Sequence, residues 1–216
     1  MEKHVKINVS AGAVLLLSAL YFVLDWDGLL ALLLAAAAHE CGHLAALRVC
    51  GGRVRALRLD VCGAVIDRRG LSGRWQEALC AAAGPAAGAV WALIASRLGA
   101  AMAWPVLVSS SGLSLVLSLF NLLPAPPLDG GRIAEALLGR RACSLLGLIT
   151  AGFTLSAGLY AVARGYGAAL FCAGAYLCLE QGRERPYPTY STGRPVFSSM
   201  KLRNSSAVPP PMLSLS

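Results

Sequence analysis

The sequence predicts an all-α polytopic membrane protein with about six transmembrane helices and a short β-hairpin-like segment near residues 53–66. Hydrophobic residues make up 56% of the 216 residues and charged residues only 14%, which is too apolar for the surface of a soluble domain of this size. Several uncharged stretches also approach about 20 residues, the length at which a helix crosses the hydrocarbon core of a bilayer. We therefore expect a membrane-embedded domain over residues 1–180.

The expected transmembrane helices coincide with six apolar stretches. They cover residues 9–24, 28–50, 76–98, 104–123, 143–163 and 165–180. The first stretch follows a basic segment, but no small-residue cleavage site precedes a soluble domain. We therefore expect this stretch to be retained as a span and not removed as a signal peptide.

The charged residues between the apolar stretches predict the orientation in the membrane. Most arginines lie in the 51–75 connection and after residue 181, whereas the first loop carries Asp25 and Asp27. By the positive-inside rule, both termini and the 51–75 connection are cytoplasmic, and Arg164 alone disagrees weakly. The net charge of +8 therefore follows from membrane topology, and no basic cluster with interleaved aromatics indicates nucleic acid.

Two segments outside the apolar stretches differ from them in composition. Residues 53–66 partly alternate polar with apolar residues and are rich in Val and Leu, which predicts one or two short strands near the interface. Such strands could pair with an extended substrate, or they could form a structural hairpin that covers helix ends. Residues 181–216 are rich in Arg, Pro and Ser, so we expect a basic, disordered cytoplasmic tail.

A metal-binding pattern lies inside the second apolar stretch. His39-Glu40-Cys41-Gly42-His43 is an H-E-x-x-H motif, and on a helix positions i and i+4 face the same side, so both imidazoles can bind one ion. Glu40 lies close enough to act as general base on a water at the metal. Ionisable residues in an apolar helix are costly unless paired or metal-bound, and the motif therefore indicates a catalytic site.

The third metal ligand must come from elsewhere, because a catalytic zinc uses three protein ligands and an open position. Asp129 is the best candidate, since it follows three prolines and precedes Gly130-Gly131, where we expect a tight turn and irregular backbone lining a cavity. The second and fourth spans run in the same direction, so His43 and Asp129 are expected on the same side of the membrane. We interpret Glu77, Glu135 and Glu180 as solvated interface residues.

These residues resemble the site-2 protease family of intramembrane zinc metalloproteases, whose signatures are H-E-x-x-H in one transmembrane helix and an Asp-Gly motif in a later one. The N-x-x-P-x-x-x-L-D-G-G pattern at residues 121–131 and the compact plan look most similar to the branch of stage IV sporulation protein FB. Ala83-Gly84-Pro85 also resembles a family motif, although close helix packing explains these small residues equally well.

The resemblance implies a zinc metalloendopeptidase with Zn²⁺ bound by His39, His43 and Asp129, Glu40 as catalytic base, and Asn121 in the substrate-binding cavity. It implies a membrane-associated protein substrate in regulated intramembrane proteolysis, first a sporulation sigma-factor precursor, together with inhibitory membrane proteins. The tail is too short and too polar for the CBS domain found in many sporulation-type members, and no inserted PDZ domain is expected.

Three other functions are compatible with parts of the pattern. A site-2 protease could act on another membrane client such as an anti-sigma factor. A metal transporter could use intramembrane His and Asp along an ion path, but it would not require a base at position 40. A non-catalytic membrane scaffold would tolerate replacement of Glu40 by Gln, whereas a protease would not.

Overall fold

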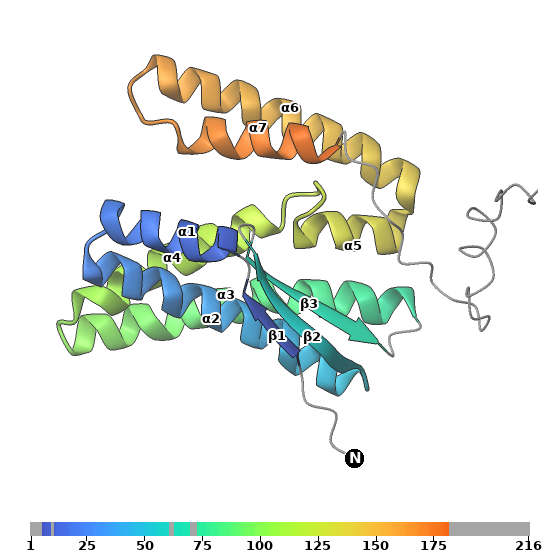
Figure 1. Cartoon of the computed structure of the whole chain (residues 1–216), viewed down its shortest axis with the longest axis horizontal. Coiled ribbons are helices and arrows are strands. Elements are labelled where there is room, and N and C mark those ends of the chain that lie inside the picture. The colour runs from blue at the N-terminus through green and yellow to red at the C-terminus, as the bar shows by residue number, and fades with distance from the viewer. Residues whose placement is uncertain (1–5, 10, 61–62, 70–72, 182–216) are drawn as a thin grey trace, which may run out of the picture. The chain divides into compact units, whose positions relative to one another are not determined.

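A computed structural model describes residues 6–9, 11–60, 63–69 and 73–181. The described residues form seven helices and three strands in one unit of the chain (Figure 1). The helices are α1 (Ala11–Val23), α2 (Trp26–Val49), α3 (Arg74–Ala101), α4 (Pro105–Asn121), α5 (Asp129–Leu138), α6 (Arg140–Ala163) and α7 (Ala169–Gln181), and the strands are β1 (Lys6–Val9), β2 (Arg53–Asp60) and β3 (Gly63–Arg69). Of the expected tail at 181–216, Gln181 ends α7 and residues 182–216 lie outside the described residues.

Among the described residues, three helices are long and apolar enough to cross a bilayer. These are α2, α3 and α6, with 24, 28 and 24 residues. The other three expected spans correspond to α1, α4 and α7, which have 13, 17 and 13 residues and are shorter than the ~20 residues of an untilted span. The chain therefore carries the helices of an integral membrane protein, and the count of six crossings stays a prediction.

The three described strands form one small sheet. The segment 53–66, where we expected a β-hairpin-like structure, lies in β2 and β3, which pair antiparallel with Leu57 opposite Ile66. β1 pairs parallel with β2 on its other side, so the strand order is β1-β2-β3. The strand β1 was not predicted. Its four residues run directly into the first expected span at 9–24, so the sequence does not mark them as a separate element.

Helices α2, α3 and α4 pack against one another through small residues. A Cβ atom added to Gly42 would lie 2.5 Å from the Cβ of Ala87, so α2 and α3 approach closely at this point. Between α3 and α4, the Ser114 hydroxyl donates to the carbonyl oxygen of Gly88 at 2.9 Å. Apolar surface alone gives little drive for helix association in lipid, so close backbone approach and interhelical hydrogen bonds hold this group of helices together.

Helices α6 and α7 lie side by side, again at glycines (Figure 1). A Cβ on Gly174 would lie 2.5 Å from the backbone nitrogen of Leu155. The segment 122–128 packs on this pair, since Ala125 forms a buried cluster with Ala151 and Leu177. The backbone that leads to residue 129 is therefore supported from α6 and α7.

Residues 129–138 form a helix that was not predicted. We expected a tight turn at Gly130-Gly131, but both glycines lie in the first turn of α5, and the irregular backbone is confined to residues 122–128. The glycines are needed for space, because a Cβ on Gly130 would lie 2.5 Å from the carbonyl oxygen of Leu123, and one on Gly131 would lie 2.5 Å from the nitrogen of Pro126. The prediction of a turn was wrong because the sequence shows small residues without showing what packs on them.

Candidate metal centre and active site

Three potential ligands converge between α2 and the start of α5. His39 and His43 lie one turn apart on α2, and Asp129 is the first residue of α5. Asp129 Oδ2 lies 3.1 Å from His39 Nε2 and 3.0 Å from His43 Nε2, and the two imidazole nitrogens are 3.2 Å apart. The three residues are only 5%, 9% and 7% exposed. The structure thus brings together the three residues that the sequence singled out as metal ligands.

The spacing and the donor set fit a zinc ion. Ligands at roughly 2.0–2.1 Å from zinc in tetrahedral geometry are separated from one another by about 3.3 Å, close to the 3.0–3.2 Å found for these three atoms. Two imidazole nitrogens and one carboxylate oxygen form a donor set typical of catalytic zinc. All three atoms lie within 4.8 Å of one another, so one ion can contact all of them.

A backbone contact sets the orientation of His43. Its Nδ1 atom donates to the carbonyl oxygen of Cys80 on α3 at 2.7 Å. In neutral imidazole this leaves Nε2 without a hydrogen, so Nε2 cannot donate to the carboxylate of Asp129. A lone pair of His43 Nε2 and the carboxylate of Asp129 then face one point, an arrangement that a cation stabilises. His39 Nδ1 is buried and has no hydrogen-bond partner among the described residues, so no such contact fixes its tautomer.

Gly84 explains one of the motifs noted in the sequence. A Cβ atom at this position would overlap the imidazole ring of His43, including its Nε2 and Cε1 atoms. The small residue in Ala83-Gly84-Pro85 therefore serves close packing, but the packing partner is a candidate metal ligand. The two interpretations of this motif, close helix packing and a family motif, are therefore both compatible with the contact between Gly84 and His43.

A salt-bridge chain continues from Asp129 and was missed by sequence reasoning. Arg132 donates through one guanidinium nitrogen to Asp129 Oδ1 at 3.1 Å and through the other to Glu77 Oε1 at 2.8 Å. Glu77, expected to be a solvated interface residue, is a partly buried member of this chain, with 19% of its side chain exposed. Residues 77 and 132 are 55 positions apart, so only tertiary packing reveals the pair.

Of the two remaining predicted site residues, Glu40 lies in the middle of α2 and Asn121 at the end of α4. Glu40 follows His39 on α2, is partly buried, and interacts electrostatically with His43, His39 and Asp129. Asn121 ends α4 and donates its side-chain amide to the carbonyl oxygen of Leu117 at 2.9 Å. Glu40 thus lies near enough to the cluster to interact with it electrostatically, whereas the described contact of Asn121 is with its own helix.

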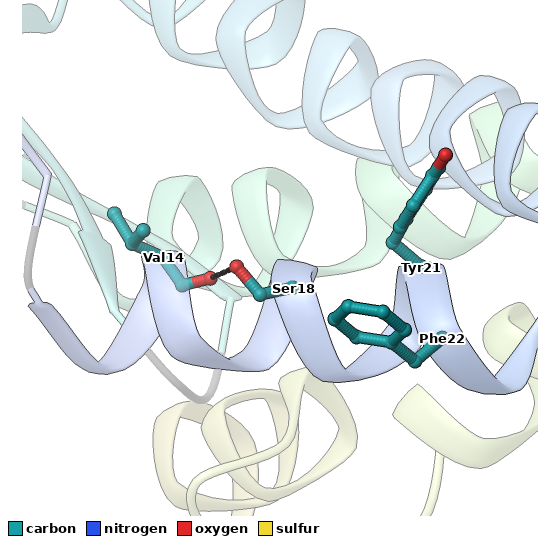
Figure 2. A pocket seen from close by; sticks show the side chains of 4 residues that line it. All are labelled: Val14, Ser18, Tyr21 and Phe22. Atoms are coloured by element: carbon teal, nitrogen blue, oxygen red, sulfur yellow. Dashed lines mark hydrogen bonds between the residues drawn. The ribbon is translucent and has the colours of Figure 1, made fainter.

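A shallow surface hollow on α1 is not part of this centre. Val14, Ser18, Tyr21 and Phe22 line it, and the Ser18 hydroxyl donates to the carbonyl oxygen of Val14 (Figure 2). All four residues belong to one apolar helix, and none of them is a candidate metal ligand. The hollow lies on one apolar helix and holds no ionisable group other than the Tyr21 phenol, so we assign it no chemistry.

Comparisons with known proteins agree with the geometry. Residues 95–160 match the model of peptidase family M50, a segment that contains Asp129 but not the H-E-x-x-H motif. Zinc metalloprotease Rip3 of Mycobacterium tuberculosis is 34% identical over 133 residues, which cover 57% of this chain and 34% of the relative. Zinc metalloprotease sll0528 of Synechocystis is 34% identical over 107 residues, which cover 47% of this chain and 28% of the relative. The chain thus spans about a third of the length of these curated relatives.

A solved structure has the same fold. The site-2 protease from Methanocaldococcus jannaschii superposes with a TM-score of 0.62 at 20% identity, over 88% of this chain and 97% of that chain. The comparisons confirm the resemblance to the site-2 protease family, and the solved structure shows a shared fold. His39, His43 and Asp129 form a group that could hold a zinc ion, as the names of the curated relatives lead one to expect. The comparisons do not single out the sporulation branch.

Proposed function

We propose that this chain, which is similar to the site-2 proteases of peptidase family M50, is an intramembrane zinc metalloprotease that hydrolyses a peptide bond in a membrane-associated protein. One observation carries the proposal. His39, His43 and Asp129 present three converging ligand atoms in a buried position, and Glu40 directly follows the first of them. A transporter would have no need of the carboxylate at position 40.

The roles of the residues follow from their positions. His39, His43 and Asp129 would hold zinc, which when bound lowers the pKa of a coordinated water and polarises a peptide carbonyl. Cys80 fixes the ring of His43 through its carbonyl oxygen, and Gly84 leaves room for that ring. Both contacts come from α3, so α3 orients the ligand that α2 carries.

Glu40 is proposed as the general base and acid. Its carboxylate takes up the proton that the attacking water loses and later delivers it to the nitrogen of the leaving amine. Partial burial supports this role, because a carboxylate shielded from bulk water keeps its proton available for the second transfer. One group thus serves both proton transfers of peptide hydrolysis.

Asn121 is proposed to bind the substrate backbone. It stands at the end of α4, eight residues before Asp129, with one amide N–H held by Leu117. An amide side chain can donate to and accept from an extended peptide, which a helical substrate offers only after it unwinds. Helix-breaking residues in the substrate near the cleaved bond would make unwinding less costly.

The substrate itself is proposed from the motif resemblance. The N-x-x-P-x-x-x-L-D-G-G pattern supports a sporulation sigma-factor precursor, restrained by inhibitory membrane proteins, and an anti-sigma factor is the second candidate. Both are membrane-associated proteins of regulated proteolysis, so they require the same site. The two candidate substrates differ in the segment of their own chain that must reach the metal site.

The orientation is proposed from charge. The 51–75 connection and the C-terminal segment are assigned to the cytoplasm because the arginines gather there, and six crossings put the N-terminus, with Lys3 and Lys6, on the same side. His43 lies six residues before the end of α2, which is roughly 9 Å of helix at ~1.5 Å per residue. With Val49 at the cytoplasmic side, the centre lies below that surface and within reach of water.

Co-expression tests the proposal directly. The chain or its Glu40→Gln variant is expressed with a tagged sigma-factor precursor, and in parallel with a tagged anti-sigma factor, and the products are blotted. Cleavage of either client by the native chain alone supports the protease and identifies the substrate class. Equal cleavage by both forms rejects the role of Glu40, and zinc flux into proteoliposomes that persists in Glu40→Gln would favour a transporter.

A further inference from the structure

The two carboxylate oxygens of Asp129 have separate partners. Oδ2 faces His39 and His43, whereas Oδ1 accepts from the guanidinium of Arg132. The second nitrogen of the same guanidinium is bound to Glu77 on α3. Arg132 is only 29% exposed at its side chain and Glu77 only 19%, so this chain of contacts is partly shielded from water.

We propose that Arg132 is the positioning residue of the metal centre, and that it holds Asp129 so that a single oxygen faces the ion. The proposal rests on the metal site of the proposed function. Arg132 does not touch the point where His39, His43 and Asp129 converge and is therefore not a catalytic residue. It acts through the carboxylate that it orients.

The position of Asp129 in the chain explains why it needs an external support. Asp129 begins α5 directly after the irregular segment 122–128, and no side chain caps this helix end. The histidines, by contrast, stand in the middle of a 24-residue helix. A guanidinium fork that holds the carboxylate by one nitrogen and Glu77 of α3 by the other fixes the side chain of Asp129 directly.

Arg132 also limits how Asp129 can bind. With Oδ1 occupied by the guanidinium, the carboxylate offers one oxygen, and a three-ligand centre with an open position results. A carboxylate that turned both oxygens to the ion would fill this position. We therefore infer that Arg132 keeps a coordination site free for water and substrate.

Glu77 completes the arrangement by anchoring the arginine. At formal charges, Asp129, Glu77 and Glu40 carry two more negative charges than Arg132 compensates, which matches the charge of one divalent cation. An arginine bound only to Asp129 would weaken the hold of that carboxylate on the ion. Sharing the guanidinium with Glu77 leaves Asp129 more of its negative charge for the metal.

The test measures the metal, not the cleavage. Full-length wild type, Arg132→Gln, Arg132→Lys and Glu77→Gln are purified in lipid nanodiscs and titrated with Zn²⁺ against a chromogenic chelator, and the Co²⁺ forms are examined by visible absorption. Loss of an outer-shell partner commonly costs about 10- to 100-fold in metal affinity. We expect that loss for Arg132→Gln and a smaller loss for Arg132→Lys, which keeps the charge without the fork. Both variants should show an altered cobalt spectrum, because the carboxylate is free to turn.

Two controls separate positioning from general stability. Arg141→Gln makes the same change at an exposed arginine at the start of α6 and should leave the zinc affinity and the cobalt spectrum unchanged. The double variant Glu77→Gln/Arg132→Gln should bind zinc no more weakly than Arg132→Gln alone, because Glu77 acts through the arginine.

The results for wild type and the variants distinguish a failure of this inference from a failure of the proposed function. If wild type binds zinc and Arg132→Gln has the same affinity and cobalt spectrum, the inference is wrong while the proposed function stands. Where Arg132→Gln does not fold, as judged by helical circular dichroism, the same criterion applies to Arg132→Lys. If wild type itself binds no zinc, the proposed function and the inference both fall.

Discussion

The Nδ1 atom of His43 lies 2.7 Å from the carbonyl oxygen of Cys80, so a backbone atom of α3 determines which nitrogen of this α2 imidazole is available to a metal ion. This contact assigns the hydrogen of neutral His43 to Nδ1 and leaves Nε2 free as a ligand. No substitution of the Cys80 side chain removes the carbonyl. The contact is therefore sensitive to the spacing of the two helices, which Gly42 and Gly84 set.

Widening this spacing should damage the centre. In Gly84→Ala the new methyl group would overlap the His43 ring, so we expect zinc affinity at least about tenfold weaker and a loss of about 1–3 kcal/mol in stability from overpacking. Gly112→Ala is the matched control on α4, because nothing lies within 4 Å of the added Cβ. Equal zinc affinities in the two variants, by chelator competition, would refute the role assigned to Gly84.

Replacing Glu40 should separate binding from catalysis. Glu40→Gln keeps the shape of the side chain but removes the base, and we expect cleavage to fall by about 10²- to 10⁴-fold with zinc content unchanged. Asp27→Asn makes the equivalent change in the first turn of the same helix and should cleave normally. A Glu40→Gln form that loses zinc along with activity would indicate a ligand and not a base.

Removing the metal should destabilise the chain. The buried His39, His43 and Asp129 lose their common partner when zinc is stripped, so thermal unfolding in nanodiscs should shift to lower temperature after chelation and return with added zinc. At a free zinc concentration 100 times the dissociation constant, the expected stabilisation is about 2.7 kcal/mol. His39→Ala should show no shift, and an equal shift in this variant would locate the zinc elsewhere.

The start of α5 should tolerate no added methyl group. A Cβ on Gly130 would overlap the carbonyl of Leu122, so Gly130→Ala should displace Asp129 and weaken zinc binding even though alanine favours helix. Gly152→Ala on α6, where the added Cβ meets nothing within 4 Å, should bind zinc as wild type does. Normal zinc binding by Gly130→Ala would show that Asp129 does not depend on this close backbone contact.

The sequence predicted the long helices well because apolar length is a strong signal. The second expected stretch, 28–50, corresponds to α2 at Trp26–Val49, and the shift at its start arises because the Asp25 side chain caps the helix by accepting from the Gly28 N–H at 2.9 Å. The amphipathic helix α5 was not predicted because it has only 10 residues and carries two glycines, which are poor helix formers, in its first turn.

The cluster of candidate ligands could be predicted from the sequence, but its supporting contacts could not. H-E-x-x-H and Asp129 stand out as ionisable residues in an apolar setting, and the structure brings His39, His43 and Asp129 together. The contacts around them are a backbone carbonyl at Cys80 and a salt bridge between Glu77 and Arg132. Neither has a local signature, since each depends on how α3 packs against α2 and α5.

The most direct measurement is the zinc content of the purified chain by atomic spectroscopy. Wild type and Glu40→Gln should each carry one zinc per chain, and His39→Ala, His43→Ala and Asp129→Ala should carry little or none after the same dialysis. Full zinc occupancy in all three ligand variants, or none in wild type prepared with zinc present, would contradict the assignment of this group as the catalytic metal centre.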